Sequence, residues 1–172
     1  MRKIIILITI GILFIILPAM SSQYNVYTPH NYNRNFNFAE EKERILFILD
    51  LSNSMDEPLE NSTKFQLMRN TMNKILPQIS PDTWVGLRVY GHKMGFTPIE
   101  ACHASTLISP ISTNNSKNIQ HALIKTKPRG MTPITYSLKQ AIKYDFMGFS
   151  GRKHIILLTD GGENCDESPC TF

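Results

Sequence analysis

A run of five apolar residues, Ile45 to Leu49, leads directly into the polar segment Asp50–Ser54, which reads Asp-Leu-Ser-Asn-Ser. This pattern predicts a strand that is buried on both faces, as in the middle of a parallel sheet. In extended backbone, residues i, i+2 and i+4 point the same way, so the side chains of Asp50, Ser52 and Ser54 are expected to converge. One carboxylate and two hydroxyls suit Mg²⁺ or a similar hard cation. Taken alone, the segment also fits an ordinary polar turn.

Further strands and helices are predicted to alternate along the chain. The predicted strands are Arg44 to Leu49, Trp84 to Tyr90, His154 to Thr159 and a short one at Thr106 to Ile108; the predicted helices are Lys64 to Leu76, Ser116 to Thr126 and Pro133 to Tyr144. Such alternation predicts an α/β fold, a doubly wound (Rossmann-like), mostly parallel sheet with helices on both faces. Asp50 and Asp160 follow strand ends and Thr132 precedes a helix, so all three are expected at the sheet edge where ligands bind.

Three segments in a fixed order carry a resemblance to a known family. They are Asp50–Ser54, then Gly130–Ile134 (Gly-Met-Thr-Pro-Ile), then Leu157–Glu163 (Leu-Leu-Thr-Asp-Gly-Gly-Glu). Together they resemble the von Willebrand factor A-type domain, from about Arg44 to the end of the chain. The ordered set is specific, whereas each segment alone is not.

The resemblance implies a metal-ion-dependent adhesion site. In that family the residues matching Asp50, Ser52 and Ser54 hold a cation, here expected to be Mg²⁺, or else Mn²⁺ or Ca²⁺. Those matching Thr132 and Asp160 contact the metal directly or through water. A protein partner then completes the shell with an Asp or Glu carboxylate. Because the protein supplies few anionic groups, the cation keeps positive charge and open positions for that carboxylate.

Some of these residues have simpler alternative roles. Thr132 can cap a helix that has Pro133 at its first position. Asp160 can serve as a turn residue before Gly161 and Gly162. Glu163, with the acidic residues that follow it, is interpreted as part of a solvated loop.

The three cysteines are Cys102, Cys165 and Cys170. An exported chain can hold disulfides, and an odd number leaves at least one thiol unpaired or bonded to another molecule. Some bacterial members of the resembled family are similar in the loop after the Thr-Asp-Gly motif, and Cys102 also fits such members. We predict a Cys165–Cys170 disulfide with Cys102 unpaired. A bond from Cys102 to either of the others is the alternative.

The chain is expected to consist of a signal peptide at 1–21, a linker at 22–43 and the von Willebrand factor A-type domain at 44–172. Arg2 and Lys3 precede an apolar core from Ile4 to Leu17, which is short for a membrane span of about 20 residues. Export to the periplasm or the medium is therefore predicted, with an uncleaved membrane anchor as the alternative. The linker is rich in Asn and Tyr, so its aromatic residues form either a plain spacer or a binding tract.

Composition and motifs exclude several functions. The formal net charge is only +4 and no basic stripe is visible, so no nucleic-acid partner is predicted. The five histidines have no zinc spacing, and no nucleophile elbow, phosphate loop or dinucleotide fingerprint occurs. Haloacid-dehalogenase-like phosphatases also place an Asp after the first strand. They require a second carboxylate two residues later, where this chain has Ser52.

The predicted function is that of a non-enzymatic, metal-dependent, adhesion-type module that captures a partner carboxylate. One departure from the family pattern stands out, because Phe172 comes only twelve residues after Asp160. The family normally continues with more helices and at least one strand, so the domain is expected to be C-terminally incomplete. A non-functional fragment of a split gene, and a metal-dependent phosphatase, are the alternative functions.

Overall fold

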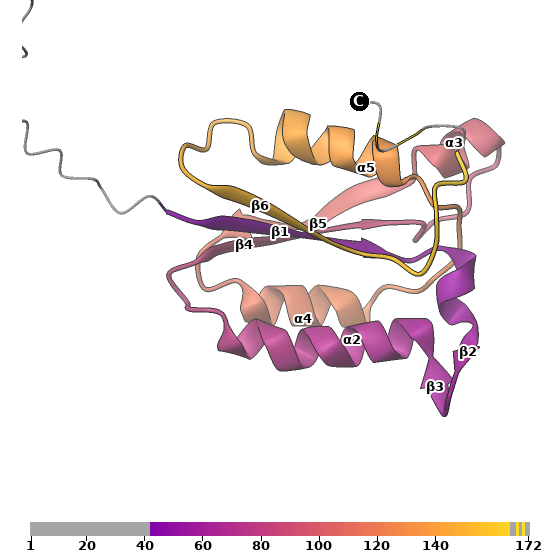
Figure 1. The fold of residues 1–172 in the computed structure, drawn as a ribbon, viewed down its shortest axis with the longest axis horizontal. Coiled ribbons are helices and arrows are strands. Elements are labelled where there is room, and N and C mark those ends of the chain that lie inside the picture. Colours follow the sequence, from indigo (N-terminus) through magenta and orange to yellow (C-terminus); the bar gives the residue numbers. More distant parts are fainter. Residues whose placement is uncertain (1–41, 166–167, 169, 171–172) are drawn as a thin grey trace, which may run out of the picture. The chain divides into compact units, whose positions relative to one another are not determined.

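The computed structural model describes residues 42–165, 168 and 170 (Figure 1). The predicted signal peptide, and the predicted linker apart from its last two residues, lie outside them. In chain order the elements are β1 (Arg44–Asp50), η1 (Asn53–Asp56), β2 (Pro58–Leu59), β3 (Ser62–Thr63), α2 (Lys64–Ile75), η2 (Leu76–Gln78), β4 (Trp84–Tyr90), α3 (Pro98–Cys102), β5 (Ser105–Ser112), α4 (Ser116–Ile124), α5 (Ile134–Gln140), η3 (Ala141–Asp145, a π-helical turn) and β6 (Lys153–Leu158). Within the described residues, no helix is long and apolar enough to cross a membrane.

The main sheet has four strands in the order β5-β4-β1-β6. β1 is parallel to both of its neighbours, and β4 pairs with β5 in the antiparallel direction. β1 lies inside the sheet because its side chains are apolar on both faces. Leu46 and Ile48 enter one hydrophobic cluster, and Phe47 and Leu49 enter the other. The predicted α/β class and mostly parallel sheet are confirmed.

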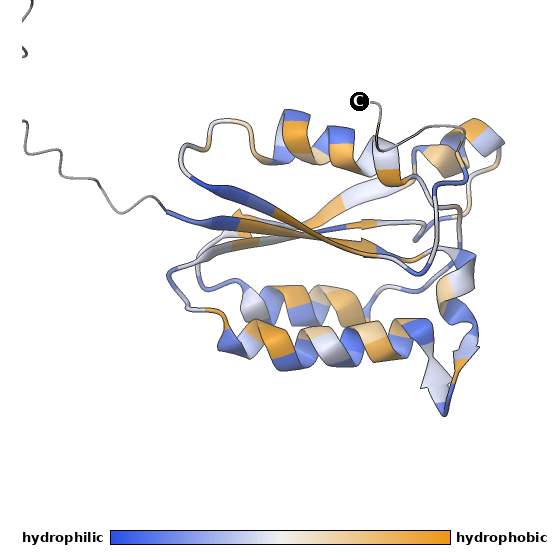
Figure 2. Cartoon of the chain, in the orientation of Figure 1, coloured by the Kyte–Doolittle hydropathy of each residue, from blue (hydrophilic) through white to orange (hydrophobic). Residues whose placement is uncertain are grey.

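Helices cover both faces of this sheet. α2 and α4 lie on one face, and α5 with η3 lies on the other (Figure 1). Figure 2 shows hydrophobic residues concentrated in the middle of the strands, where both helical layers pack. α2 starts where predicted, because the Thr63 side chain accepts a hydrogen bond from the Gln66 N–H and the Gln66 side chain accepts one from the Thr63 N–H.

Several elements differ from the sequence prediction. The helix expected over Pro133 to Tyr144 is α5, which ends at Gln140 and is followed by the π-helical turn η3. β5 is longer than the expected Thr106 to Ile108 and runs through Pro110. A proline is tolerated there because β5 is an edge strand of the described sheet and its register with β4 shifts at this point. The short helix α3 was not predicted, although Thr97 before Pro98 is a typical helix start, and the Thr97 hydroxyl does accept from the Glu100 N–H.

A buried ion pair fixes η3 against the sheet. The Arg88 guanidinium donates from Nε and Nη2 to the two carboxylate oxygens of Asp145, both at 2.7 Å. The Arg88 and Asp145 side chains are only 6% and 3% exposed. A paired geometry of this kind satisfies both charges, so the interior of this face tolerates them.

Candidate metal centre

Three loops meet at the carboxyl ends of the parallel strands, at the right of Figure 1. They follow β1, precede α5 and follow β6. Ser52 and Gly130 form an isolated parallel bridge, and the Asn53 N–H donates to the Gly130 carbonyl at 2.9 Å. The segments Asp50–Ser54 and Gly130–Ile134, almost eighty residues apart in sequence, are thus joined through their main chains.

Two glycines make this approach possible. Gly91 follows β4 with φ of 68°, and a Cβ there would lie 2.6 Å from both the Ser52 nitrogen and the Met131 oxygen. The Gly130 N–H donates to the Gly91 carbonyl at 2.7 Å, and a Cβ on Gly130 would lie 2.4 Å from the Lys93 oxygen. No larger residue fits at either position without moving backbone.

Asp50 lies at the centre of the loops and is fully buried. Its Oδ1 accepts the Ser52 N–H at 2.7 Å, and its Oδ2 accepts the Thr159 hydroxyl at 2.7 Å. In the described part of the chain no positively charged side chain pairs with it. Burial, and then the nearby charge of Asp50, raise the pKa of the Tyr90 phenol, so Tyr90 stays neutral beside it. A buried carboxylate without a counter-charge is costly unless a cation compensates it.

Hydroxyl groups connect Asp50 to the third loop. The Ser52 and Ser54 hydroxyl oxygens are 3.1 Å apart, and the Ser54 hydroxyl donates to Asp160 Oδ1 at 3.0 Å. The predicted residues Asp50, Ser52, Ser54 and Asp160 therefore form one continuous polar network at the strand ends.

Thr132 reaches the same edge through its main chain. It is buried, and its N–H donates to the Asn164 side-chain oxygen at 2.7 Å. The alternative capping role is wrong, because α5 begins at Ile134 with Pro133 as its N-cap residue. The N–H of the buried residue Thr135, in the first turn of α5, instead donates to the Glu163 carboxylate at 2.8 Å. Glu163 is thus tied to α5 rather than part of a free acidic loop.

A lysine that was not predicted to be part of the site lies beside Asp160. Lys64 Nζ donates to Asp160 Oδ2 and to Glu57 Oε2, each at 2.7 Å. Hydrogen bonds to Asp160 and then to Glu57 raise the pKa of Lys64. Burial opposes ionisation of Asp160, but hydrogen bonds from Lys64 and Ser54 prevail and lower the pKa of its carboxyl. Asp160 is therefore ionised at neutral pH.

The predicted Cys165–Cys170 disulfide is wrong. The structure bonds Cys102 to Cys165, with Cα atoms 5.5 Å apart, and leaves Cys170 as an exposed free thiol. The physical reason is that α3 ends against the loop that follows β6, so residues 63 positions apart in sequence reach bonding distance. Closeness in sequence was a poor guide to which thiols meet. The bond anchors the loop that carries Asp160 and Asn164.

The donor chemistry of this network fits a small divalent cation. Its groups are carboxylate and hydroxyl oxygens, which Mg²⁺ prefers, and one of the carboxylates lacks a counter-charge. Among the described residues, no group of three or more His, Cys, Asp or Glu is placed to hold a metal. A cation here would therefore depend on the serine hydroxyls, with Asp50 as the main charged ligand.

Comparison with known proteins identifies the family. The von Willebrand factor type A domain matches residues 45–163, and the chain belongs to this family. Two curated relatives are the uncharacterized proteins YwmC and YwmD of Bacillus subtilis (strain 168). YwmC is 26% identical over 135 residues and YwmD 26% over 140, covering 76% and 77% of this chain. The chain spans 60% and 62% of their respective lengths.

Solved structures share the fold. Proximal thread matrix protein 1 from the mussel byssus is 26% identical with a TM-score of 0.54, covering 74% of this chain and 30% of that one. The PilB minor pilin from Streptococcus sanguinis is 22% identical with a TM-score of 0.55, covering 70% and 30%. The pilus adhesin SpaC from Lactobacillus rhamnosus GG is 19% identical with a TM-score of 0.56, covering 71% and 16%.

Proposed function

We propose that this chain is an exported, non-enzymatic binding module that holds a divalent cation and, through it, the carboxylate of a protein partner. Asp50, Ser52 and Ser54 would hold Mg²⁺, or Mn²⁺ or Ca²⁺, with Thr132 and Asp160 contributing directly or through water. The bound cation would supply positive charge and open coordination positions for an incoming Asp or Glu side chain.

This proposal rests mainly on the surroundings of the Asp50 carboxylate. Its carboxylate is fully buried, accepts two hydrogen bonds and has no cationic partner among the described residues. A charge in that setting is stabilised by a cation and is otherwise a cost to the fold. The neighbouring hydroxyls of Ser52 and Ser54 are suitable further ligands.

The chain's own groups support binding more than catalysis. Ser52 occupies the place of the second phosphatase carboxylate, so Asp50 lacks the acidic partner that such an enzyme requires. Lys64 neutralises Asp160 and so limits the negative charge of the site. The Cys102–Cys165 bond is compatible with an oxidising compartment and hence with export.

Titration calorimetry with Mg²⁺ alone tests the metal site. Wild type should bind Mg²⁺. Loss of a residue that only supports a metal ligand typically lowers metal affinity roughly 10- to 100-fold, and Asp50→Asn should lower it by more, because Asp50 would be a ligand itself. Asp82→Asn is the matched control, because Asp82 is an exposed carboxylate just before β4, at the opposite edge of the sheet. Equal Mg²⁺ affinity in wild type and Asp50→Asn would rule out the assignment.

A further inference from the structure

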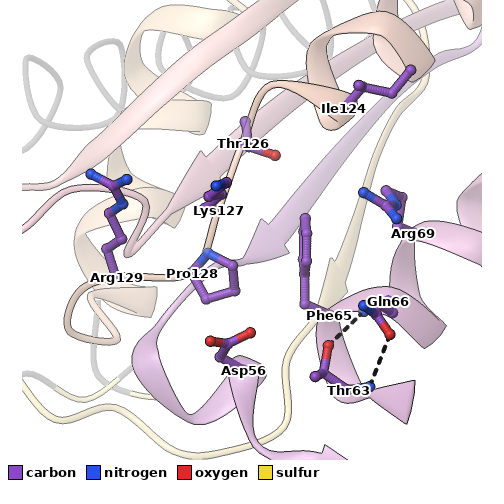
Figure 3. A pocket seen from close by; sticks show the side chains of 10 residues that line it. All are labelled: Asp56, Thr63, Phe65, Gln66, Arg69, Ile124, Thr126, Lys127, Pro128 and Arg129. Carbon is purple, nitrogen blue, oxygen red and sulfur yellow. Dashed lines mark hydrogen bonds between the residues drawn. The ribbon is translucent and has the colours of Figure 1, made fainter. Parts of the chain in front are cut away.

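Basic side chains gather in a groove beside the candidate metal centre. Two hollows of about 330 and 300 Å³ share the lining residues Thr126, Lys127 and Arg129. We call them together the basic groove; its lysines and arginines are Arg69, Lys93, Lys125, Lys127 and Arg129. Asp56 is the one carboxylate that lines it. Figure 3 shows Arg69 on one side of the first hollow, with Lys127 and Arg129 on the other side.

The backbone of the groove is held in place. The segment between α4 and α5 contains Pro128, which restricts its conformation. The Arg129 N–H donates to the carbonyls of Leu51 and Gly91 at 3.0 and 3.1 Å. The Thr126 hydroxyl donates to the Leu123 carbonyl at 2.9 Å. The cationic side chains therefore project from a fixed support, which lowers the ordering cost of binding.

The charges of the groove are not neutralised within the described part of the protein. The side chains of Lys93, Lys125, Lys127 and Arg129 are exposed and make no ion pair or hydrogen bond there. Arg69 only stacks on Phe65, with its guanidinium 5.7 Å from the ring centre. Other basic residues are paired, as Lys64 is with Asp160 and Arg88 with Asp145. Unpaired like charges on one surface favour an anionic ligand.

The groove adjoins the candidate metal centre. Arg129 precedes Gly130, which is bridged to Ser52, and Asp56 follows Ser54 by two residues. A chain whose carboxylate reached the centre would have its neighbouring residues next to these cations.

We propose that the basic groove binds acidic residues adjoining the captured carboxylate, so that the partner is an acidic protein segment with several Asp or Glu. This inference rests on the proposed function of the site. A nucleic acid is a poorer fit, because single strands are bound by stacking on exposed aromatic rings. Phe65, the one Phe, Tyr or Trp among the residues that line the groove, is buried and is covered by Arg69.

Binding of two synthetic peptides to the full chain tests the proposal. The first has a central Asp flanked on both sides by Glu, and the second has Gln in place of each Glu. The first should bind more tightly at low salt, and added salt should weaken it more steeply. Lys127→Glu with Arg129→Glu should weaken the first peptide about tenfold or more, since several surface charge contacts are reversed. Lys74→Glu with Lys117→Glu, exposed on α2 and α4, is the matched control and should change little.

Separate measurements distinguish failure of the groove from failure of the metal site. Mg²⁺ affinity without peptide should be equal in wild type and in the Lys127→Glu, Arg129→Glu variant. Equal binding of the two peptides would overturn the groove while leaving the metal site intact. Retention of the acidic peptide in EDTA, with loss in the groove variant, would support the groove and contradict carboxylate capture. Tighter binding of heparin or a DNA oligonucleotide than of the acidic peptide would overturn the choice of partner.

Discussion

The imidazole ring of His92, just beyond β4, is neutral in the folded protein at neutral pH. Its Nε2 lies 3.1 Å from the Thr106 hydroxyl, while its buried Nδ1 has no hydrogen-bond partner. Burial, with a smaller contribution from the charge of Lys93, lowers the pKa of His92 to about 4. The unfolded chain has an ordinary histidine pKa of about 6.5. Protonation therefore favours the unfolded state between these two values.

The first prediction concerns pH. As pH falls from about 6.5 to about 4, the unfolded state binds a proton at His92 that the folded state does not, so the free energy of unfolding should fall. His92→Gln should remove that part of the slope in urea unfolding at pH 7, 5.5 and 4.5. His121→Gln, at an exposed position on α4, is the control and should keep it. Parallel curves for wild type and His92→Gln would contradict the prediction.

Among individual residues, sequence analysis predicted those members of the site whose grouping depends only on local backbone geometry. The i, i+2, i+4 spacing places Asp50, Ser52 and Ser54 together without any knowledge of the fold. Lys64 could not be found this way, because its contact with Asp160 joins residues 96 positions apart. The role of Asn164 beside Thr132 depends in the same way on how the last loop folds back.

The Cys102–Cys165 bond joins two elements, α3 and the loop after β6. The bridged residues are 63 positions apart, so the bond restricts a long loop of the unfolded chain. Cys102→Ser should lower the free energy of unfolding by about 2–4 kcal/mol. Cys170→Ser is the control and should leave it nearly unchanged, because Cys170 is a free, exposed thiol. Non-reducing peptide mapping should recover a Cys102–Cys165 peptide pair; a Cys165–Cys170 pair would restore the sequence-based pairing.

Among the elements, the long strands were predicted to within about a residue. The helices were predicted less closely, since α4 ends at Ile124 instead of Thr126 and α5 ends at Gln140 instead of Tyr144. β4 was predicted with its observed ends, and α2 ends one residue before the prediction. The weak cases were short or interrupted: α3 has five residues, and β5 contains Pro110, which normally argues against a strand. Neighbouring structure stabilises such elements, so their sequences carry little periodic signal.

For the molecule as a whole, alternation of strands and helices was enough to predict the fold class, and motif order was enough to predict the family. The basic groove was not predicted, since its cations come from α2, the loop after β4 and the segment after α4. No stretch of sequence reads as a basic stripe, and only packing of the three segments creates one. The candidate metal centre likewise forms only when the chain folds, because the loops after β1, before α5 and after β6 then meet at one edge of the sheet.

Cation binding should be coupled to the stability of the whole domain, because Asp50 is buried in the folded state and hydrated in the unfolded one. Mg²⁺ at about 100 times its dissociation constant, bound only to the folded state, adds about 2.7 kcal/mol. For a domain of this size that corresponds to a rise of about 10 °C in Tm relative to EDTA. Thermal unfolding followed by circular dichroism in Mg²⁺ and in EDTA measures it.

Asp50→Asn separates this coupling from a general effect of salt or chelator. The variant removes an uncompensated buried charge, so in EDTA it should melt at a higher temperature than wild type. In Mg²⁺ the order should reverse, because only wild type gains the binding free energy. Asp82→Asn, which changes an exposed carboxylate, should follow wild type in both conditions. If wild type and Asp50→Asn instead responded equally to Mg²⁺, the stabilising cation would have to bind elsewhere, and the charge of Asp50 would be balanced without it.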